Sequence, residues 1–249
     1  MGDVEKILKY TKNIHMQALT ANSYLFLMNY YNENYKSYKD EMNCTPAFWA
    51  MTYNSWYDSC FMFLARMFDV SSDVAGIRQL RELVGNNTSL LGAEKISFPM
   101  RKLDEKIFGK EVEVQDALFD ILDIEDKRRN YYFDATGVEM VDIFSKKFSS
   151  MSKILDKLRD QRNKIVAHNS GEIEFDENKL KQIKRLSLDD ENLLITYALD
   201  FTQFITYAIK KEYLPIKYGN IEDIDFVMHF IHDGYEKMKE RDKAISEMM

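Results

Sequence analysis

The chain has 249 residues, of which 45% are hydrophobic and 30% are charged, proportions that are typical of a globular protein with a buried core. Its formal net charge of −7 argues against a protein that coats DNA non-specifically. The two cysteines, Cys44 and Cys60, match no disulfide framework, and no apolar run is long enough to span a bilayer. The first residues carry charges and no apolar core, so we expect no secretory signal. We therefore expect a cytoplasmic protein with no membrane partner.

Long segments of helical period, with only three Pro and nine Gly residues, predict an all-α protein. The first helix is expected from Val4 to the tyrosines at 30–38. The second should begin at Pro46, because proline suits the first helical position and Thr45 can cap the free N–H groups. A shorter helix is expected at about 73–84.

The segment 86–147 is interrupted by Gly92, Pro99 and Gly109 and has no continuous helical pattern. We interpret it as an insertion of helical or irregular structure. The sequence thus predicts a single all-α domain over the whole chain, with a core formed by residues of about 4–85 and 148–212.

Three more helices are predicted after the insertion. The first would be capped by Ser149 or Ser150. The second would be capped by Asp189 or Asp190, and the last would cover about 221–245.

One arginine in the first of these helices lies where an apolar residue is expected. Apolar side chains recur there at the helical period, at Met151, Ile154, Leu155, Leu158, Ile165 and Val166. At about 100° per residue, Arg162 projects near the middle of this apolar stripe. Because a guanidinium keeps its charge, we expect Arg162 to have an anionic partner or to face an open cleft.

The same helix is basic within an acidic chain. From Lys146 to His168 there are seven Lys and Arg residues and two Asp residues, a net charge of +5. A basic helix on an acidic body suits focused binding of a polyanion, and the candidate RNA-binding residues are Lys157, Arg159 and Lys164. The alternative is a solvated helix face without a ligand.

Three segments of the chain resemble HEPN proteins. The stretch from Arg162 to His168 is similar to the signature of HEPN ribonucleases, in which a polar residue follows an arginine and a histidine comes four to six residues on. The segments ARMFD (65–69) and LSLDDENLLITYALDFTQFI (186–205) are similar to segments of abortive-infection HEPN proteins of the AbiU-like kind. The resemblance covers the second helix and about residues 148–212.

This resemblance implies an all-α HEPN-like bundle that forms a homodimer and cleaves RNA without a metal or cofactor, as a toxin or phage-defence effector. In the family, two Arg/His helices meet across the dimer axis and form a composite site. By that resemblance Arg162, Asn163 and His168 would be catalytic.

The chemistry of these side chains suits RNA cleavage. His168 would take the proton of the 2′-OH or protonate the leaving 5′ oxygen, because an imidazole titrates near neutral pH. Arg162 would stabilise charge on the phosphate oxygens, and Asn163 would orient the phosphate or the histidine. The products would carry 2′,3′-cyclic phosphate and 5′-hydroxyl ends.

An ideal helix separates Arg162 from His168 by about 9 Å along its axis and by roughly 120° around it. One helix therefore directs the two side chains poorly at a single phosphate. A second copy of the helix in a dimer, or unwinding at Ala167, would bring them together.

Other interpretations remain open at this level. The chain can be a non-catalytic HEPN-like module that binds RNA, a nucleotide or a protein partner, or a dimeric scaffold in which Arg162 pairs with a buried carboxylate. An antitoxin or regulatory protein is a further candidate partner. Regulation by a nucleotidyltransferase antitoxin is not predicted, because Ser170 stands where toxins with such an antitoxin often have a tyrosine.

Two smaller patterns also have alternatives. Arg66 and Asp69 can contact RNA, but an i, i+3 ion pair at the end of a core helix is the preferred interpretation. His229 and His232 lie on one helix face, yet no zinc-ligand spacing accompanies them, so we predict no metal site.

Overall fold

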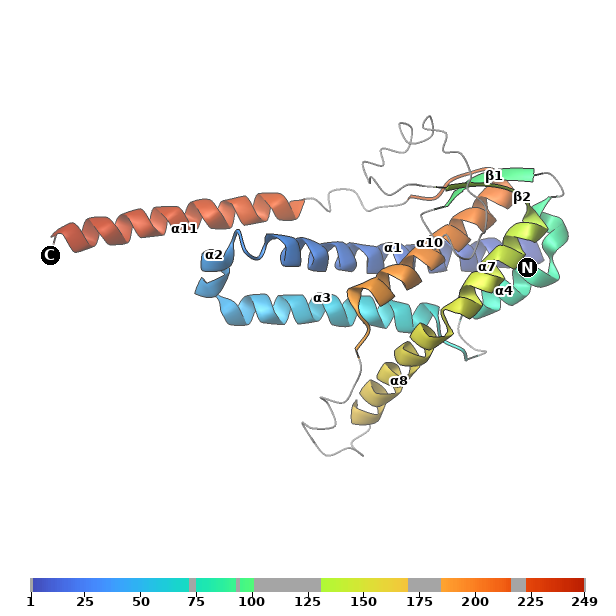
Figure 1. Ribbon diagram of the computed structural model, residues 1–249, viewed down its shortest axis with the longest axis horizontal. Helices are drawn as coiled ribbons and strands as arrows, with labels where there is room; N and C mark the ends of the chain where they lie inside the picture. Colours follow the sequence, from blue (N-terminus) through green and yellow to red (C-terminus); the bar gives the residue numbers. More distant parts are fainter. Residues whose placement is uncertain are drawn as a thin grey trace. The chain divides into compact units, whose positions relative to one another are not determined.

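The computed structural model describes residues 2–71, 75–92, 95–100, 131–169, 185–215 and 223–248. These residues are mostly helical, with one two-stranded antiparallel sheet, and the predicted all-α fold class is confirmed (Figure 1). They divide into two compact units, one of Met1–Ala18 with Phe63–Leu214 and the other of Leu19–Met62 with Pro215–Met249. Within the described ranges, no helix is both long and apolar enough to cross a membrane.

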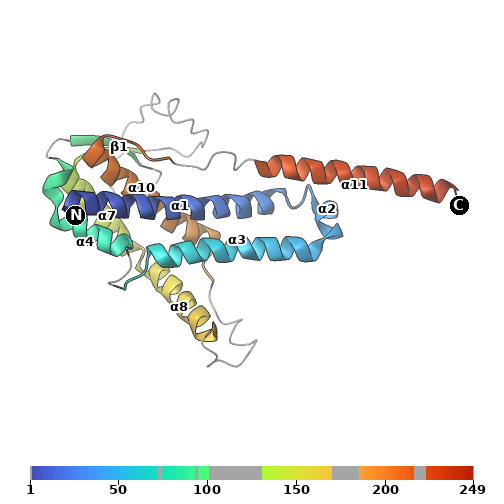
Figure 2. The same cartoon turned by 180° about the vertical axis from the view of Figure 1, so that it is seen from behind.

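The second unit contains α2 (Lys39–Cys44), the C-terminal half of α1 (Asp3–Asn34) and most of α3 (Pro46–Met67). In this unit the two long helices run side by side in opposite directions (Figures 1 and 2). Aromatic side chains join them, with the ring centroids of Tyr31 and Trp49 lying 6.1 Å apart. The start of α3 agrees with the prediction, because proline loses no helical hydrogen bond there.

Helix α11 (Asp223–Met248) corresponds to the predicted last helix, and its first half contacts α2. Met228 is buried in a cluster that contains Met42. Nearby, Nδ1 of His232 lies 2.5 Å from Oε1 of Glu41, whose side chain is 5% exposed. Apolar packing and an ionic contact therefore hold the start of α11 within the second unit.

The segment 86–147 contains regular structure. Helix α4 (Ile77–Asn86) leads into the 3₁₀ turn η1 (Thr88–Leu91) and strand β1 (Lys95–Met100). Strand β2 (Tyr131–Thr136) pairs antiparallel with β1 and leads directly into α7 (Gly137–Ser150). Neither strand is predicted from the sequence, because each pairs with a partner distant in the chain. Residues 101–130 lie outside the described residues.

The start of α7 is fixed by a capping box. The hydroxyl of Thr136 accepts the N–H of Glu139 at 3.3 Å, and the Glu139 carboxylate accepts the N–H of Thr136 at 2.7 Å. A Cβ at Gly137 would overlap the side chain of Leu91, so only glycine allows this close approach to η1. Phe144 is fully buried, so α7 contributes to the core of the first unit.

The predicted domain boundaries themselves stay a prediction.

Helix α8 (Ser152–Asn169) follows α7 after the single residue Met151. The predicted caps, Ser149 and Ser150, are instead the last two residues of α7. Their hydroxyl groups donate to carbonyl oxygens about one turn earlier, which directs both side chains back along α7 rather than toward the start of α8.

Helix α10 (Leu188–Lys210) is buried on most of its faces. Its N-cap is Ser187, whose hydroxyl accepts the N–H of Asp190 at 3.1 Å, so neither Asp189 nor Asp190 is the cap. The ring of Phe144 packs against three aromatic rings of this helix, those of Tyr197, Phe201 and Phe204. These contacts place α7 and α10 side by side in the core of the first unit.

Candidate active site

Helix α8 presents one face to the core of the first unit. Leu158 and Gln161 are each 3% exposed, and the Gln161 side-chain oxygen accepts a hydrogen bond of 3.1 Å from the N–H of Leu186. Arg162 follows directly and lines a pocket together with Leu155 and Leu158. The i, i+3, i+7 spacing of these three residues keeps Arg162 on the apolar stripe, in agreement with the prediction.

The Arg162 guanidinium pairs with Asp69, the last residue of the ARMFD segment. Its Nη1 atom lies 2.8 Å from Oδ2 of Asp69, and the two side chains are 29% and 20% exposed. Asp69 also accepts the N–H of Ser71 at 3.0 Å. Burial alone would raise the pKa of Asp69, but the hydrogen bonds from Ser71 and Arg162 hold it below its ordinary value. Arg162 thus has both an anionic partner and an open cleft.

Asp69 does not form the predicted i, i+3 ion pair with Arg66. Helix α3 ends at Met67, so Asp69 lies beyond the helix and the helical spacing no longer brings it to Arg66. Within the described residues its carboxylate pairs with Arg162 instead.

The other predicted catalytic residues lie on the same helix. Asn163 is exposed, and its side-chain oxygen accepts a long hydrogen bond of 3.4 Å from Nη2 of Arg162. His168 and Lys164 belong to α8, but their side chains lie outside the described residues. The structure therefore brings Asn163 to Arg162, and the role of His168 stays a prediction.

The basic charge of the α8 region is largely compensated by carboxylates. Nζ of Lys157 lies 3.0 Å from Oδ2 of Asp190, and Nη1 of Arg159 lies 3.3 Å from Oδ1 of Asp156. Lys147 is 2% exposed and so adds little to the surface charge. The positive side chains of this segment therefore do not form a continuous surface of unpaired charge. The RNA-binding roles of Lys157 and Arg159 stay predictions.

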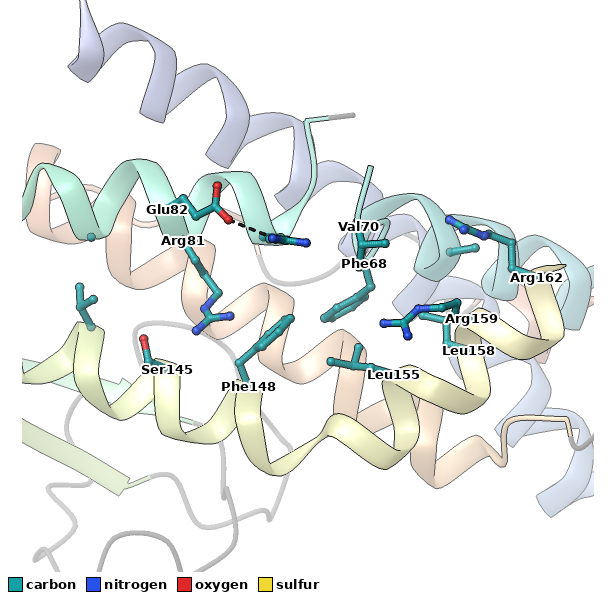
Figure 3. A pocket seen from close by; sticks show the side chains of 14 residues that line it. Phe68, Val70, Arg81, Glu82, Ser145, Phe148, Leu155, Leu158, Arg159 and Arg162 are labelled. Atoms are coloured by element: carbon teal, nitrogen blue, oxygen red, sulfur yellow. Dashed lines mark hydrogen bonds and ion pairs between the residues drawn. The ribbon is translucent and has the colours of Figure 1, made fainter. Parts of the chain in front are cut away.

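A pocket of about 470 Å³ lies among α4, α7, α8 and the end of α3, all in the first unit (Figure 3). Its apolar wall includes Phe68, Val141, Phe148, Leu155 and Leu158. Four arginines also line it, Arg78 and Arg81 from α4 and Arg159 and Arg162 from α8. A volume of this size is in the range of small-ligand sites.

The two arginines of α4 differ in their contacts. Nε of Arg78 lies 3.1 Å from Oε1 of Glu82, one turn later in the helix. The guanidinium carbon of Arg81 lies 4.0 Å from the centroid of the Phe148 ring, and in the described part of the chain no carboxylate pairs with it. Figure 3 shows Arg81 extending from α4 toward α7. The ring stabilises this cation but does not neutralise its charge.

Arg78 and Arg81 are functional candidates that the structure adds to those predicted from the sequence. With Gly85 they lie at i, i+3 and i+7 on α4, and all three line the pocket. This spacing, next to the buried residues Leu80 and Val84, is the signal that could have found them. It indicates a shared face, whereas the pocket exists only because α7 and α8 pack opposite that face.

The two histidines considered as a metal pair have other contacts. Nδ1 of His229 lies 2.8 Å from the carbonyl oxygen of Asp225, and His232 contacts Glu41. Among the residues that the structure describes, no group of three or more His, Cys, Asp or Glu side chains is arranged to hold a metal ion.

A search of curated proteins and a search of solved structures each found no significant match. A family model of the HEPN type, described as AbiU2, matches residues 4–230. The match covers most of the chain, including the ARMFD segment, α8 and α10, and it confirms the resemblance drawn from those segments. The chain therefore belongs to the AbiU2 family of HEPN proteins.

Proposed function

We propose that this HEPN protein is a metal-independent RNA endonuclease that acts as a toxin or phage-defence effector. The observation that carries the proposal is the position of Arg162, whose guanidinium is held by Asp69 at a pocket lined by four arginines. Asn163 contacts this guanidinium, and the same helix carries His168. Family membership supports the proposal, because the arginine, polar residue and histidine of the HEPN pattern all lie on α8.

The proposed reaction uses the 2′-OH of RNA as the nucleophile. The 2′ oxygen forms a bond to the adjacent phosphorus, and the bond from phosphorus to the 5′ oxygen breaks. A His168 imidazole accepts the 2′-OH proton, and a protonated imidazole gives a proton to the leaving 5′ oxygen. Arg162 donates to the phosphate oxygens, on which negative charge increases in the transition state. The ends are a 2′,3′-cyclic phosphate and a 5′-hydroxyl.

The geometry of α8 favours a composite site in a homodimer. The helix continues to Asn169, so unwinding at Ala167 is not part of this structure. On ideal geometry, Arg162 and His168 of one helix diverge by roughly 120° and are offset by about 9 Å. A second copy of α8 facing the first would bring Arg162 close to His168 of the partner subunit. The two histidines would then supply the base and the acid.

Asp69 limits how a phosphate can reach Arg162. A guanidinium has five N–H donors, and Asp69 accepts from the Nη1 side. Asn163 accepts a long hydrogen bond from Nη2, and the donors that neither Asp69 nor Asn163 uses can contact a phosphate while Asp69 keeps the side chain oriented. In this reaction Asp69 would be a positioning residue and would not touch the substrate.

A second candidate function is a non-catalytic HEPN module that binds RNA, a nucleotide or a protein partner. The observation that favours it is charge compensation. Three cations on α8 each have a carboxylate partner within the chain, and these cations are Lys157, Arg159 and Arg162. Such pairing gives Arg162 a structural role that requires no catalysis. An antitoxin or regulatory protein would be the natural partner of such a module.

Cleavage and binding measured side by side distinguish the two functions. Wild-type protein and His168→Ala are incubated with total cellular RNA in excess EDTA, and RNA binding of both proteins is measured separately on a 2′-O-methyl RNA, which cannot be cut by 2′-OH attack. The nuclease predicts discrete cleavage by wild type only, with RNA binding retained in the variant. A folded wild-type protein that binds RNA and leaves it intact, indistinguishable from His168→Ala, would contradict the nuclease and favour the binding module.

A further inference from the structure

The arginine-lined pocket has more positive charge than the neighbouring carboxylates neutralise. Arg78, Arg159 and Arg162 each have a carboxylate partner. Arg81 has none within the described residues, and its guanidinium lies over the ring of Phe148. Among the described residues, one positive charge of the pocket therefore has no carboxylate partner, and it lies on a half-buried side chain beside an apolar wall.

This combination of features indicates the chemistry of a ligand. A half-buried guanidinium without a carboxylate is best compensated by a bound anion. One unit of positive charge matches a phosphate diester, which carries one negative charge, better than a phosphate monoester, which carries nearly two. The apolar wall with its aromatic rings suits a planar base.

We propose that this pocket holds one unpaired nucleotide of an RNA strand, with its base against the apolar wall of Val141, Phe148 and Leu155 and its phosphate diester on Arg81. The proposal rests on the proposed function, because it assigns the pocket to a nucleotide next to the scissile phosphate at Arg162. It deepens that function by defining the substrate as single-stranded at this position.

The arrangement of the lining residues fits the order of groups along a strand. In Figure 3, Arg81 and Phe148 lie toward one end of the pocket, Arg162 lies toward the other, and Phe68 lies between them. A strand that passes from Arg162 to Arg81 would meet a guanidinium, an apolar aromatic surface and a second guanidinium. In an RNA strand two successive phosphates flank one nucleoside, whose base can project onto the surface between the two guanidinium groups.

The shape of the site also selects against a duplex. A volume of about 470 Å³ accommodates a single small group of atoms and not a paired helix. A base can pack against the apolar wall only after it has left its pairing partner, which costs least in a loop, a bulge or an unpaired end. Unpaired RNA should therefore bind more tightly than paired RNA of the same sequence.

Gly85 offers a test that removes no charge and breaks no contact. It lines the pocket from α4, and a Cβ at this position would meet no atom within 4 Å. Gly85→Phe would fill the pocket, whereas Gly85→Ala leaves most of the space and favours the helix. The probe is a 5′-fluorescein-labelled octamer of uridine, and its binding is measured by fluorescence anisotropy in a His168→Ala background, so that it is not cut.

The expected effects are specific to the pocket. Gly85→Phe should weaken binding of the octamer by roughly tenfold or more, the effect of losing a base–aromatic contact, while Gly85→Ala should stay near the parent protein. Arg81→Ala should weaken binding by roughly tenfold, because a charged hydrogen bond is lost. Lys146→Ala is the matched control, since it removes one exposed cation from α7 outside the pocket.

Two further probes distinguish a nucleotide of single-stranded RNA from a nucleotide of duplex RNA and from a free nucleotide. The same octamer annealed to its complement, and free uridine monophosphate as a competitor, should both bind at least roughly tenfold more weakly than the single strand. Equal competition by the free monophosphate would overturn the assignment to an RNA strand. Equal binding of the duplex would overturn the selection of unpaired RNA.

Different experimental results would contradict the nucleotide-binding pocket and the proposed nuclease activity. Equal affinities for Gly85→Phe and Gly85→Ala, in proteins with matching circular dichroism and thermal unfolding, would overturn the pocket assignment even if wild type cleaves RNA. Conversely, suppose that RNA binding depends on Gly85 and Arg81 in a protein that never cleaves RNA. This result would support the nucleotide-binding site and contradict the nuclease activity.

Discussion

The carboxylate of Asp69 and the guanidinium of Arg162 meet with 2.8 Å between Oδ2 and Nη1, although the two residues are far apart in the sequence. Asp69 ends the ARMFD segment, and Arg162 begins the stretch that contains His168. The third segment similar to HEPN proteins contributes Asp190, which pairs with Lys157 on the same helix. The three segments therefore meet on α8, which gives a structural reason for their joint occurrence.

Breaking this ion pair should reveal a strong coupling between its members. Asp69→Asn and Arg162→Met each leave a largely buried polar partner, so a double-mutant cycle should give a coupling energy of about 1–3 kcal/mol. The measurement is unfolding in urea. Arg66→Met, which alters an exposed arginine near Asp69, is the control and should change stability by less than about 0.5 kcal/mol. A coupling near zero would contradict the ion pair.

The contribution of Asp69 to stability should disappear in acid. Burial opposes the shift, but hydrogen bonds from Ser71 and Arg162 lower the pKa of Asp69 below its ordinary value of 3.8. A carboxyl with a lowered folded pKa stabilises the fold fully above its unfolded pKa, and the contribution is lost as the pH falls through the folded pKa. The difference in unfolding free energy between wild type and Asp69→Asn should thus be constant near neutral pH and decrease below about pH 4. A difference that persists unchanged in stronger acid would argue against this assignment.

His232 should titrate above its ordinary pKa of 6.5, because Glu41 accepts a hydrogen bond from its ring. Burial acts to raise the pKa of Glu41, but the hydrogen bond from His232, a backbone hydrogen bond and the charges of His232 and Lys239 together lower it below its ordinary value. The histidine stabilises the fold fully below 6.5 and loses its contribution as the pH rises through its raised pKa, while Glu41 contributes fully above 4.5. The contact of α11 with α2 should therefore be strongest between these values.

Proton NMR of the imidazole tests the His232 assignment directly. In Glu41→Gln the pKa of His232 should fall toward its ordinary value. Glu236→Gln removes a carboxylate that acts on His232 more weakly, and it should produce a smaller decrease. Equal effects of the two substitutions would show that general charge, and not the Glu41 hydrogen bond, sets the pKa.

Phe144 should be essential to the core of the first unit, although it lies in the segment interpreted as an insertion. It is fully buried and packs on three rings of α10, so Phe144→Ala should lower stability by about 3–5 kcal/mol. Val138, on the same helix, is 55% exposed, and Val138→Ala should cost less than about 1 kcal/mol. Similar losses for both in thermal unfolding would mean that α7 is not part of the core.

The parts of the fold that depend on local signals could be predicted from the sequence. Pro46 defines the start of α3, because the geometry of proline acts on its own turn. The serines at 149–150 show where such reasoning fails, since a hydroxyl has both an N-terminal and a C-terminal helix within reach. The strands β1 and β2 could not be predicted, because their pairing depends on chain segments that come together only in the folded protein.

The candidate site could be predicted in the same partial way. Charge and helical period alone require that Arg162 has a carboxylate or a cleft, and the structure has both. The identity of the carboxylate could not be predicted, because Asp69 lies beyond the end of α3 and no sequence pattern relates its position to α8. Arg81 was missed for a related reason, since its neighbour Phe148 lies on another helix and no local pattern joins them.

The most direct test of the central claim is the chemistry of the RNA ends. RNA cut by wild-type protein in excess EDTA is mapped with and without enzymatic removal of 3′ phosphates, beside the Arg162→Ala and His168→Ala variants. RNA cut by the wild-type protein should carry 2′,3′-cyclic phosphate and 5′-hydroxyl ends, and neither variant should produce such ends. Cleavage that leaves 5′-phosphate and 3′-hydroxyl ends, or that persists in His168→Ala, would contradict this prediction.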